Sequence, residues 1–154
     1  MKVVFLDFDG VLNSTGYTRT IDPDKFGGLS IEWWAEGLDP EAVARLNTLL
    51  ERTGAKVVIS SSWRINSPLT ALQVLLRMRG FEGTSISKTE LLSGAERCEE
   101  IQEWLDRHPE VTSYVILDDN TDAEIEGHFI HTDMRVGLTD ADVEEAIEIL
   151  GKLS

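Results

Sequence analysis

The feature that most constrains this chain is an apolar, β-branched run at its start that ends in two acids. Lys2 to Leu6 is followed by Asp7 and Asp9, whose carboxylates are one residue apart. A short, continuous apolar run of this kind is typical of a strand buried on both faces, as in a parallel sheet. Gly10 then allows the backbone to turn sharply. The sequence therefore predicts that both acids lie at the carboxyl end of a central strand, where open α/β sheets bind their ligands.

Two further apolar runs, residues 56–59 and 111–117, are also predicted to be buried strands. Hydroxyl groups and a guanidinium follow the first of these runs, and adjacent carboxylates follow the second. Because the carboxyl ends of parallel strands meet at one edge of a sheet, we expect these groups to gather around a single crevice with the first two acids. The residues that follow the two runs are Ser60, Ser61, Arg64, Asp118 and Asp119.

Four segments with apolar residues at helical spacing separate or follow these runs. They begin with capping residues or capping boxes near Asp39, Ser67, Ser93 and Thr139. Strands that alternate with helices indicate an α/β fold, and we expect a three-layer, Rossmann-like domain with a central, mainly parallel sheet. A chain of 154 residues is long enough for a proper core and is expected to form one domain over residues 1–154.

The segment over residues 14–38 is irregular and contains several glycine and aromatic residues. A loop of this length inside a compact domain is usually a functional lid or a mobile segment. We predict a flap or small cap-like insertion whose aromatic side chains close over the acids. The alternative is that these side chains fill core against a neighbouring helix. No larger segment separates the first acids from the first predicted helix, so a cap is at most small. The aromatic residues are Tyr17, Phe26, Trp33 and Trp34.

Charge and cysteine content narrow the classes of partner. The formal net charge of −14, from 28 acidic and 14 basic residues, disfavours non-specific binding to nucleic acid or to an anionic membrane. It leaves room for a local basic pocket that holds a phosphate. The single cysteine, Cys98, suits a reducing compartment, and no apolar run approaches the ~20 residues that span a bilayer. With a strand predicted directly at the N-terminus, no signal peptide is expected, and the expected location is the cytoplasm. The oligomeric state is left open.

The chemistry of the predicted crevice calls for two kinds of ligand. Four carboxylates repel one another unless a cation lies between them, and a hard divalent ion such as Mg²⁺, which prefers oxygen ligands, is the expected cofactor. Hydroxyl groups and a guanidinium beside the acids suit phosphate oxygens. Together the two halves predict metal-assisted phosphoryl transfer.

Two of the strand ends resemble signatures of the haloacid dehalogenase (HAD) superfamily of phosphohydrolases. Residues 7–13, which read Asp-Phe-Asp-Gly-Val-Leu-Asn, resemble the first signature, and residues 117–119, which read Leu-Asp-Asp, resemble the fourth. The resemblance implies a HAD-like domain. The acid at Asp9 favours phosphatase or phosphomutase chemistry, because dehalogenases and transport ATPases of that superfamily lack an acid there.

The two remaining signatures leave alternatives open. Ser60 or Ser61 resembles the second, a hydroxyl residue that closes the second strand. Arg97 or Lys88 corresponds to the third, a basic residue that supports the phosphoryl group. We favour Arg97, because it lies at a helix start shortly before the strand that ends in Asp118, as the basic residue of that superfamily does.

The resemblance implies a role for each matching residue. Asp7 would be the nucleophile that forms an aspartyl-phosphate. Asp9 would be the general acid for the leaving group and then the base that activates water. Asp7, Asp9 through its carbonyl, and Asp118 would hold Mg²⁺, with Asp119 assisting. The residues expected to bind the phosphate or the substrate are Ser60, Ser61, Arg64, Arg97 and Gly10.

The expected activity is a Mg²⁺-dependent phosphatase that acts on a phosphomonoester. Residues 61–64 and 115–119 resemble small HAD domains of RNA-repair proteins, and phosphatase domains of polynucleotide kinases pair such a serine with an arginine, here Arg64. This implies a phosphorylated nucleic-acid end, with a 3′-phosphate, as one candidate substrate. The charge of −14 fits long RNA or DNA poorly, so a phosphorylated small molecule is the other candidate.

Three other classes of function are weighed against this one. A receiver-type signalling domain also combines acids, a hydroxyl and a lysine with Mg²⁺, but its adjacent acids follow the first strand rather than a late one. A non-catalytic regulatory or binding protein would keep the fold without turnover, although every expected catalytic residue type is present. A phosphomutase would need a substantial cap, which the chain lacks.

Overall fold

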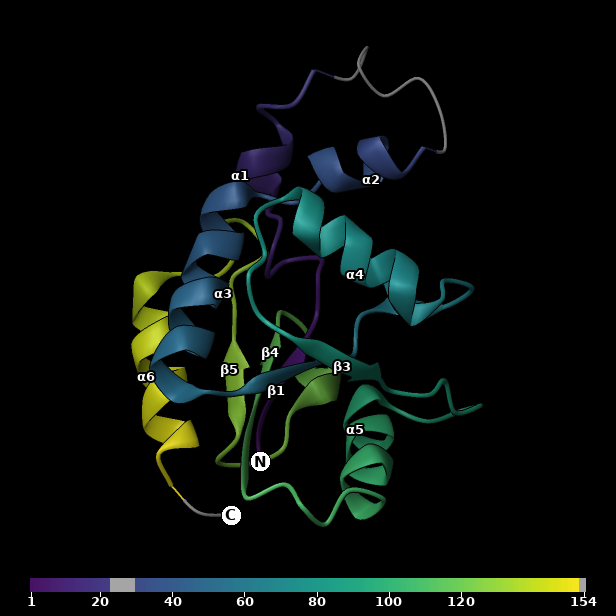
Figure 1. Ribbon diagram of the computed structural model, residues 1–154, viewed down its shortest axis with the longest axis vertical. Coiled ribbons are helices and arrows are strands. Elements are labelled where there is room, and N and C mark those ends of the chain that lie inside the picture. The colour runs from purple at the N-terminus through teal and green to yellow at the C-terminus, as the bar shows by residue number, and fades with distance from the viewer. Residues whose placement is uncertain (23–29, 153–154) are drawn as a thin grey trace.

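The computed structural model describes residues 1–22 and 30–152, and its centre is a five-stranded sheet with the order β3-β2-β1-β4-β5 (Figure 1). All four neighbouring pairs are parallel, and β1 lies in the middle, as the apolar run at the N-terminus predicts. The expected α/β class with a central parallel sheet is therefore confirmed. The strands are β1 (Lys2–Leu6), β2 (Lys56–Ile59), β3 (Ser85–Lys88), β4 (Ser113–Asp118) and β5 (Phe129–His131).

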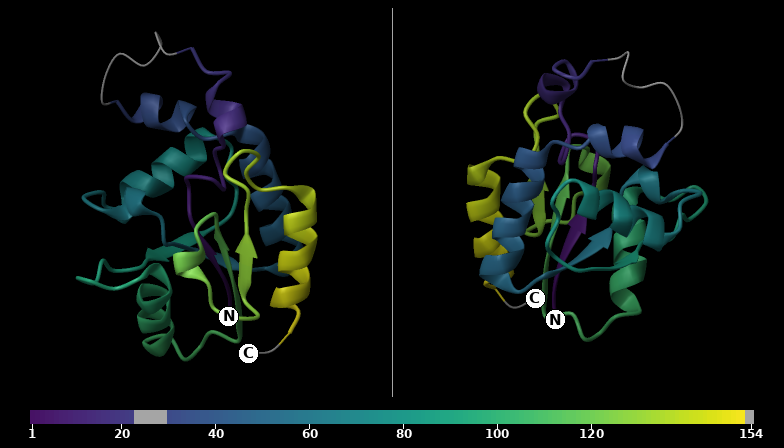
Figure 2. Two further views of the ribbon diagram at one scale, coloured as in Figure 1. Left: turned by 180° about the vertical axis from the view of Figure 1, so that it is seen from behind. Right: turned by 45° about the horizontal axis from the view of Figure 1, so that its top comes forward.

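Helices cover both faces of the sheet and complete the three layers (Figure 2). Side chains of α3, α4 and α6 pack in the core that contains Val4 and Leu6 of β1. Side chains of α5 and of the short 3₁₀ helix η3 pack in the core that contains Val3 and Phe5. The helices are α1 (Thr15–Thr18), α2 (Ile31–Glu36), α3 (Pro40–Thr53), α4 (Leu69–Met78), α5 (Arg97–Asp106) and α6 (Asp140–Leu150), with the 3₁₀ helices η2 (Ser62–Arg64) and η3 (Thr121–Ala123).

Of the four expected caps, two are found, one is displaced, and the one at Ser67 is wrong, because Pro68 is the N-cap of α4 and has no side chain that can accept a hydrogen bond. Asp39 accepts a hydrogen bond from the Glu41 N–H at the start of α3, and Thr139 forms a capping box at the start of α6. The predicted capping box at Ser93 is wrong. Residues 93–94 form a turn, and α5 begins three residues later with Glu96 as its N-cap, paired with Glu99. Glu96 takes the role that the pattern gave to a serine because its carboxylate also accepts a backbone hydrogen bond.

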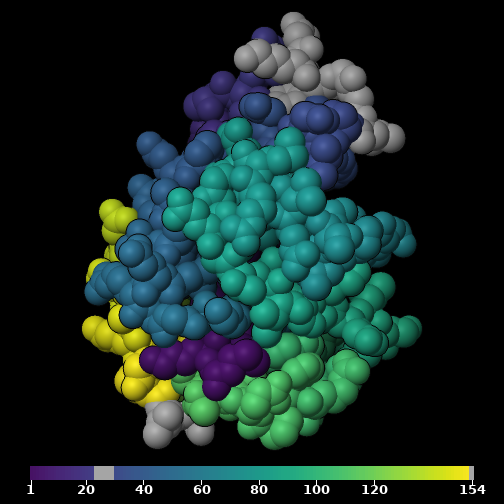
Figure 3. All heavy atoms as spheres, in the orientation of Figure 1, coloured from purple at the N-terminus to yellow at the C-terminus, as the bar shows by residue number. Residues whose placement is uncertain are grey.

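The described parts of residues 14–38 lie beyond the carboxyl edge of the sheet, where they form α1 and α2 (Figure 1). Phe26 lies outside the described residues. The Tyr17 hydroxyl donates a hydrogen bond of 2.9 Å to the Glu36 carbonyl and joins the two helices. Ala35 and Leu38 are buried in the core, and α2 lies beside α4 on the surface (Figure 3). Part of the segment thus fills core, while its action as a flap stays a prediction.

A membrane-spanning helix would need length and apolar composition together. Within residues 1–22 and 30–152, no helix combines the two.

Candidate active site

The register of the sheet brings three polar residues to one level at its carboxyl edge. Leu6 of β1 pairs with Ile59 of β2 and with Leu117 of β4. The ladder then continues by one residue, because the Asp7 N–H donates to the Leu117 carbonyl and the Ser60 N–H to the Leu6 carbonyl, both at 3.0 Å. Asp7 follows Leu6, Ser60 follows Ile59, and Asp118 follows Leu117. These three residues therefore lie side by side.

Strand alternation also places these three side chains on one face of the sheet. Phe5, Val58 and Ile116 each precede one of them by two residues, and all three pack in the core beneath α5. Side chains two residues apart on a strand point to the same face. Asp7, Ser60 and Asp118 therefore face the layer that contains α5, and Arg97 is the first residue of that helix.

Three carboxylates form a compact cluster at this point. Asp7, Asp118 and Asp119 each contribute an oxygen, and these oxygens lie within 4.8 Å of one another. Asp7 and Asp118 are buried and Asp119 is half-buried. The Arg97 Nη1 lies 3.4 Å from Asp118 Oδ2 and 3.7 Å from Asp7 Oδ1. The structure thus brings together the first and fourth predicted signatures and the favoured basic residue.

The pKa values of both buried carboxyl groups in the cluster are raised, chiefly by their burial. Burial, and after it the charge of Asp118, raises the pKa of Asp7 to about 8, against the opposing effect of Arg97. Burial raises the pKa of Asp118 to about 6, although the Asn120 N–H and Arg97 favour its charged form. A divalent cation relieves this repulsion, and three carboxylates supply the hard oxygen donors that Mg²⁺ prefers. The donor set therefore fits the metal expected from the sequence.

Gly10 makes room for Asp119 in this cluster. Its backbone has φ +78°, a left-handed conformation that L side chains rarely adopt. A Cβ atom built on Gly10 would lie 2.4 Å from Asp119 Cγ and Oδ2, which is too close for any real contact. The structure thus places Gly10 against the carboxylate of Asp119, and its contact with a phosphate stays a prediction.

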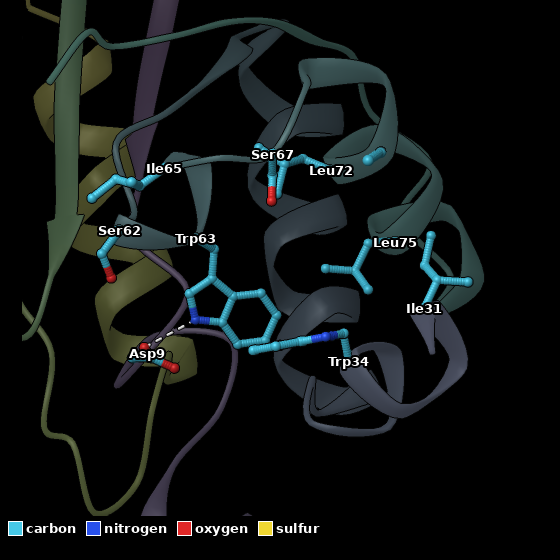
Figure 4. Close-up of a pocket in the computed structure, with 10 residues that line it drawn as sticks. Asp9, Ile31, Trp34, Ser62, Trp63, Ile65, Ser67, Leu72 and Leu75 are labelled. Carbon is cyan, nitrogen blue, oxygen red and sulfur yellow. Dashed lines mark hydrogen bonds between the residues drawn. The ribbon is translucent and has the colours of Figure 1, made fainter. Parts of the chain in front are cut away.

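The Asp9 side chain lies at the surface and does not belong to the group of three carboxylates. Its Oδ2 accepts a hydrogen bond of 3.0 Å from Trp63 Nε1 (Figure 4), and its Oδ1 accepts one of 2.8 Å from Asn13 Nδ2. The sequence did not single out either donor as a site residue. The position of Asn13 in the turn after the acids was a weak local signal, whereas Trp63 is 54 positions away in the chain.

The structure separates the two candidate serines. The Ser60 Oγ is fully buried and, among the described residues, has no hydrogen-bond partner. The Ser61 Oγ instead accepts a hydrogen bond of 3.2 Å from the Trp63 N–H and caps η2. Ser60 is thus the serine that shares the level and the face of Asp7 and keeps its hydroxyl uncommitted.

Arg64 does not lie where a phosphate-binding arginine was expected. Its side chain is 3% exposed, and its donors are directed at protein acceptors. Nε donates to the Thr89 carbonyl at 2.9 Å, Nη1 donates to the carbonyls of Ser60 and Ser61, and Nη2 pairs with the buried Glu100 carboxylate. A buried guanidinium is tolerated only when its charge and donors are satisfied in this way. The expected fork of Arg64 onto a phosphate is therefore corrected to a contact with the backbone and Glu100.

Lys88, the alternative to Arg97, is also engaged elsewhere. Its Nζ donates hydrogen bonds to the carbonyls of Arg64, at 3.1 Å, and Ser67, at 2.7 Å. Both acceptors belong to the stretch that follows β2 rather than to the carboxylate cluster. Of the two candidate basic residues, Arg97 is the one that the structure places beside Asp7.

A five-stranded parallel sheet with carboxylates and a guanidinium at its carboxyl edge is the arrangement expected of a HAD-like domain. The model of the family described as the HAD domain in Swiss Army Knife RNA repair proteins matches residues 3–143, and the chain belongs to this family. Comparisons with curated proteins and with solved structures found no match. Family membership confirms the resemblance inferred from the sequence and supports a HAD-type phosphohydrolase.

Proposed function

We propose that this protein is a Mg²⁺-dependent phosphatase that hydrolyses a phosphomonoester through an aspartyl-phosphate on Asp7. The observation that carries the proposal is the cluster of Asp7, Asp118 and Asp119 beside Arg97, at the carboxyl edge of the sheet. Carboxylates that are held together against their own repulsion are typical of sites that bind a metal and react with a phosphoryl group.

The side chains of Asp7, Asp118 and Asp119 would hold Mg²⁺, with the backbone carbonyl of Asp9 as a further ligand. When bound, the ion supplies positive charge that keeps the carboxylates ionised and balances the charge of the phosphoryl oxygens. Arg97 supplies a second positive charge at the same place, and a guanidinium donates well to phosphate oxygens. The uncommitted Ser60 hydroxyl supplies a further donor on the same face.

The chain's own residues account for both halves of the reaction. In the first half, an Asp7 carboxylate oxygen bonds to phosphorus, the bond from phosphorus to the ester oxygen breaks, and Asp9 gives its proton to that oxygen. In the second half, Asp9 takes a proton from water, the water oxygen bonds to phosphorus, and the bond between phosphorus and Asp7 breaks. Inorganic phosphate leaves, and both acids return to their starting states.

A phosphorylated nucleic-acid end is the second candidate substrate. The family description, which refers to RNA repair, favours it. The net charge of −14 opposes extended contact with a polyanion, so a short end rather than a long duplex is the form that fits this chain.

The test is phosphate release from a panel of esters, with Mg²⁺ and with EDTA. The panel runs from p-nitrophenyl phosphate through sugar phosphates and nucleotides to 3′-phosphorylated oligonucleotides. We expect release that requires Mg²⁺ and is lost in Asp7→Asn, whose circular dichroism matches the wild type. Turnover that survives in Asp7→Asn would contradict the assignment of the nucleophile. The absence of release from every ester would favour a non-catalytic regulatory protein.

A further inference from the structure

A cavity of about 590 Å³ opens directly beside Asp9 (Figure 4). It lies between α2, η2 and α4, and the described residues that line it include Asp9 but none of the three clustered carboxylates. Its size is within the range of clefts that hold a small organic group. Its wall combines the Asp9 carboxylate with indole rings and aliphatic side chains, chiefly Trp34, Trp63, Ile31, Leu72 and Leu75.

The position of Asp9 decides which part of a substrate meets this cavity. In the proposed reaction, Asp7 attacks phosphorus and Asp9 protonates the ester oxygen on the far side of phosphorus. The carbon skeleton bonded to that oxygen must therefore extend past Asp9. Because the cavity begins at the Asp9 carboxylate, it receives the leaving group rather than the phosphoryl group.

The wall of the cavity selects the chemistry of that leaving group. Trp34 and Trp63 pack edge to face with ring centroids 5.1 Å apart, and Trp34 is still 39% exposed, so its indole has surface to offer. Indole rings pack well against flat rings of a ligand, and this stacking depends little on which ring the ligand carries. Ile31 and Leu75 add aliphatic surface.

Charge at the cavity disfavours a second phosphate. Among the described residues that line it, none is a lysine or an arginine, and Asp9 contributes a carboxylate. An anionic group inside the cavity would lose hydration without gaining a positively charged partner. Ser62 and Ser67 supply polar atoms that suit neutral hydroxyl or amide groups.

We propose that this cavity is a leaving-group site for a flat, uncharged ring carried close to the ester oxygen, as in an aryl ester or a nucleoside monophosphate. The proposal rests on the phosphatase function proposed above and deepens it. A nucleobase fits whether it belongs to a free nucleotide or to the terminal residue of an oligonucleotide, and the two sources are separated by experiment.

The experiment compares esters that differ only in the ring. Adenosine 3′-monophosphate is paired with ribose 3-phosphate, and 2-phenylethyl phosphate with n-propyl phosphate, whose leaving alcohols have similar acidity. We expect the wild type to show a higher kcat/KM for the ring-bearing member of each pair. Adenosine 3′,5′-bisphosphate is expected to be poorer than the 3′-monophosphate. A 3′-phosphorylated dinucleotide shows whether the ring is accepted from an oligonucleotide end as well.

Two variants localise the preference. Trp34→Ala should lower kcat/KM for the ring-bearing esters at least about fivefold more than for the ring-free esters, as expected for loss of one stacking surface. Val74→Ala is the matched control, because Val74 is half-exposed on α4 and is not part of the cavity wall. It should change neither class. Adenosine should inhibit the wild type as a product and inhibit Trp34→Ala more weakly, whereas ribose should not inhibit either.

The possible results distinguish a failure of the leaving-group site from a failure of the proposed phosphatase function. Turnover without any preference for a ring, or a preference that survives Trp34→Ala, would overturn the leaving-group site and leave the phosphatase intact. No Mg²⁺-dependent turnover of any ester would overturn the phosphatase and this site together.

Discussion

The indole Nε1 of Trp63 donates a hydrogen bond of 3.0 Å to the Oδ2 of Asp9. The bond joins the wall of the leaving-group cavity to the acid that is proposed to protonate the leaving group. Trp63 is itself fixed, because its ring packs edge to face on Phe8 at 5.2 Å and its backbone N–H is bound by Ser61. We therefore regard Trp63 as a positioning residue for Asp9.

Trp63→Phe keeps an aromatic ring in the wall but removes the N–H donor. Hydrogen bonds to charged groups contribute about 1.5–3 kcal/mol, so kcat/KM for 2-phenylethyl phosphate should fall about tenfold or more. For p-nitrophenyl phosphate the loss should be small, because nitrophenolate leaves without a proton. Equal losses for the two esters would show that Trp63 acts on folding or on binding rather than on Asp9.

Gly10→Ala should damage the metal site more than it damages the fold. A Cβ at this position meets Asp119, while the φ of +78° adds a cost of about 1–2 kcal/mol for any L residue. Gly127→Ala is the matched control, because Gly127 has φ +81° and a Cβ added there would meet no described atom within 4 Å. We expect similar losses of stability in urea, but weaker Mg²⁺ binding by calorimetry in Gly10→Ala alone. Unchanged Mg²⁺ affinity in Gly10→Ala would remove Asp119 from the proposed ligands.

Ser60→Ala and Ser61→Ala should have opposite effects. Ser60 has no partner among the described residues, so its loss should change stability by less than about 0.5 kcal/mol. If its hydroxyl binds the phosphoryl group, kcat/KM should fall about tenfold or more. Ser61→Ala removes a cap and should cost about 1 kcal/mol with little effect on turnover. The reverse pattern, measured by urea unfolding and kinetics, would assign the phosphate contact to Ser61.

Glu100→Gln should strongly destabilise the protein. It leaves the buried Arg64 guanidinium without its counter-charge, and breaking such a pair typically costs about 3–5 kcal/mol. Glu103→Gln is the control on the same helix, because the exposed pair of Glu103 with Arg107 contributes less than about 1 kcal/mol. If Glu100→Gln were as stable as the wild type but bound phosphate more weakly, Arg64 would instead be assigned to the substrate site.

The metal-free protein should lose stability as pH rises. Burial and neighbouring charge raise the pKa of Asp7 to about 8, and burial raises that of Asp118 to about 6. An unfolded carboxyl group titrates near pH 4, so between about pH 4 and pH 8 the folded state binds protons that the unfolded chain has released. Linkage then makes the free energy of unfolding fall with rising pH through this window.

Urea unfolding in EDTA at pH 5 and pH 8 measures this effect. Asp7→Asn lacks the Asp7 contribution, so its stability relative to wild type should increase from pH 5 to pH 8 by at least about 1.4 kcal/mol, the equivalent of one pKa unit. Mg²⁺ should raise the stability of the wild type at pH 8. A wild-type-to-variant difference that is the same at both pH values would show that Asp7 is ionised throughout.

The sequence by itself determined the parallel sheet and the groups that gather at its edge. Apolar runs and caps are local patterns, and the carboxyl ends of parallel strands meet wherever such runs pair. These patterns place Asp7 and Asp118 together, whereas Arg97 is favoured over Lys88 only through the family resemblance; in the structure the Arg97 Nη1 lies within 3.7 Å of both carboxylates.

Only the tertiary structure decided how individual side chains are used. Arg64 follows a strand end, as a phosphate ligand would. Its guanidinium nevertheless forms a buried ion pair with Glu100, which is 36 positions away in the chain. Asp9 is likewise held by Trp63, and the cavity beside it forms where α2 meets α4. Such contacts join residues that are distant in sequence, and burial decides which of them must be satisfied within the protein. Local sequence patterns therefore cannot predict these long-range contacts.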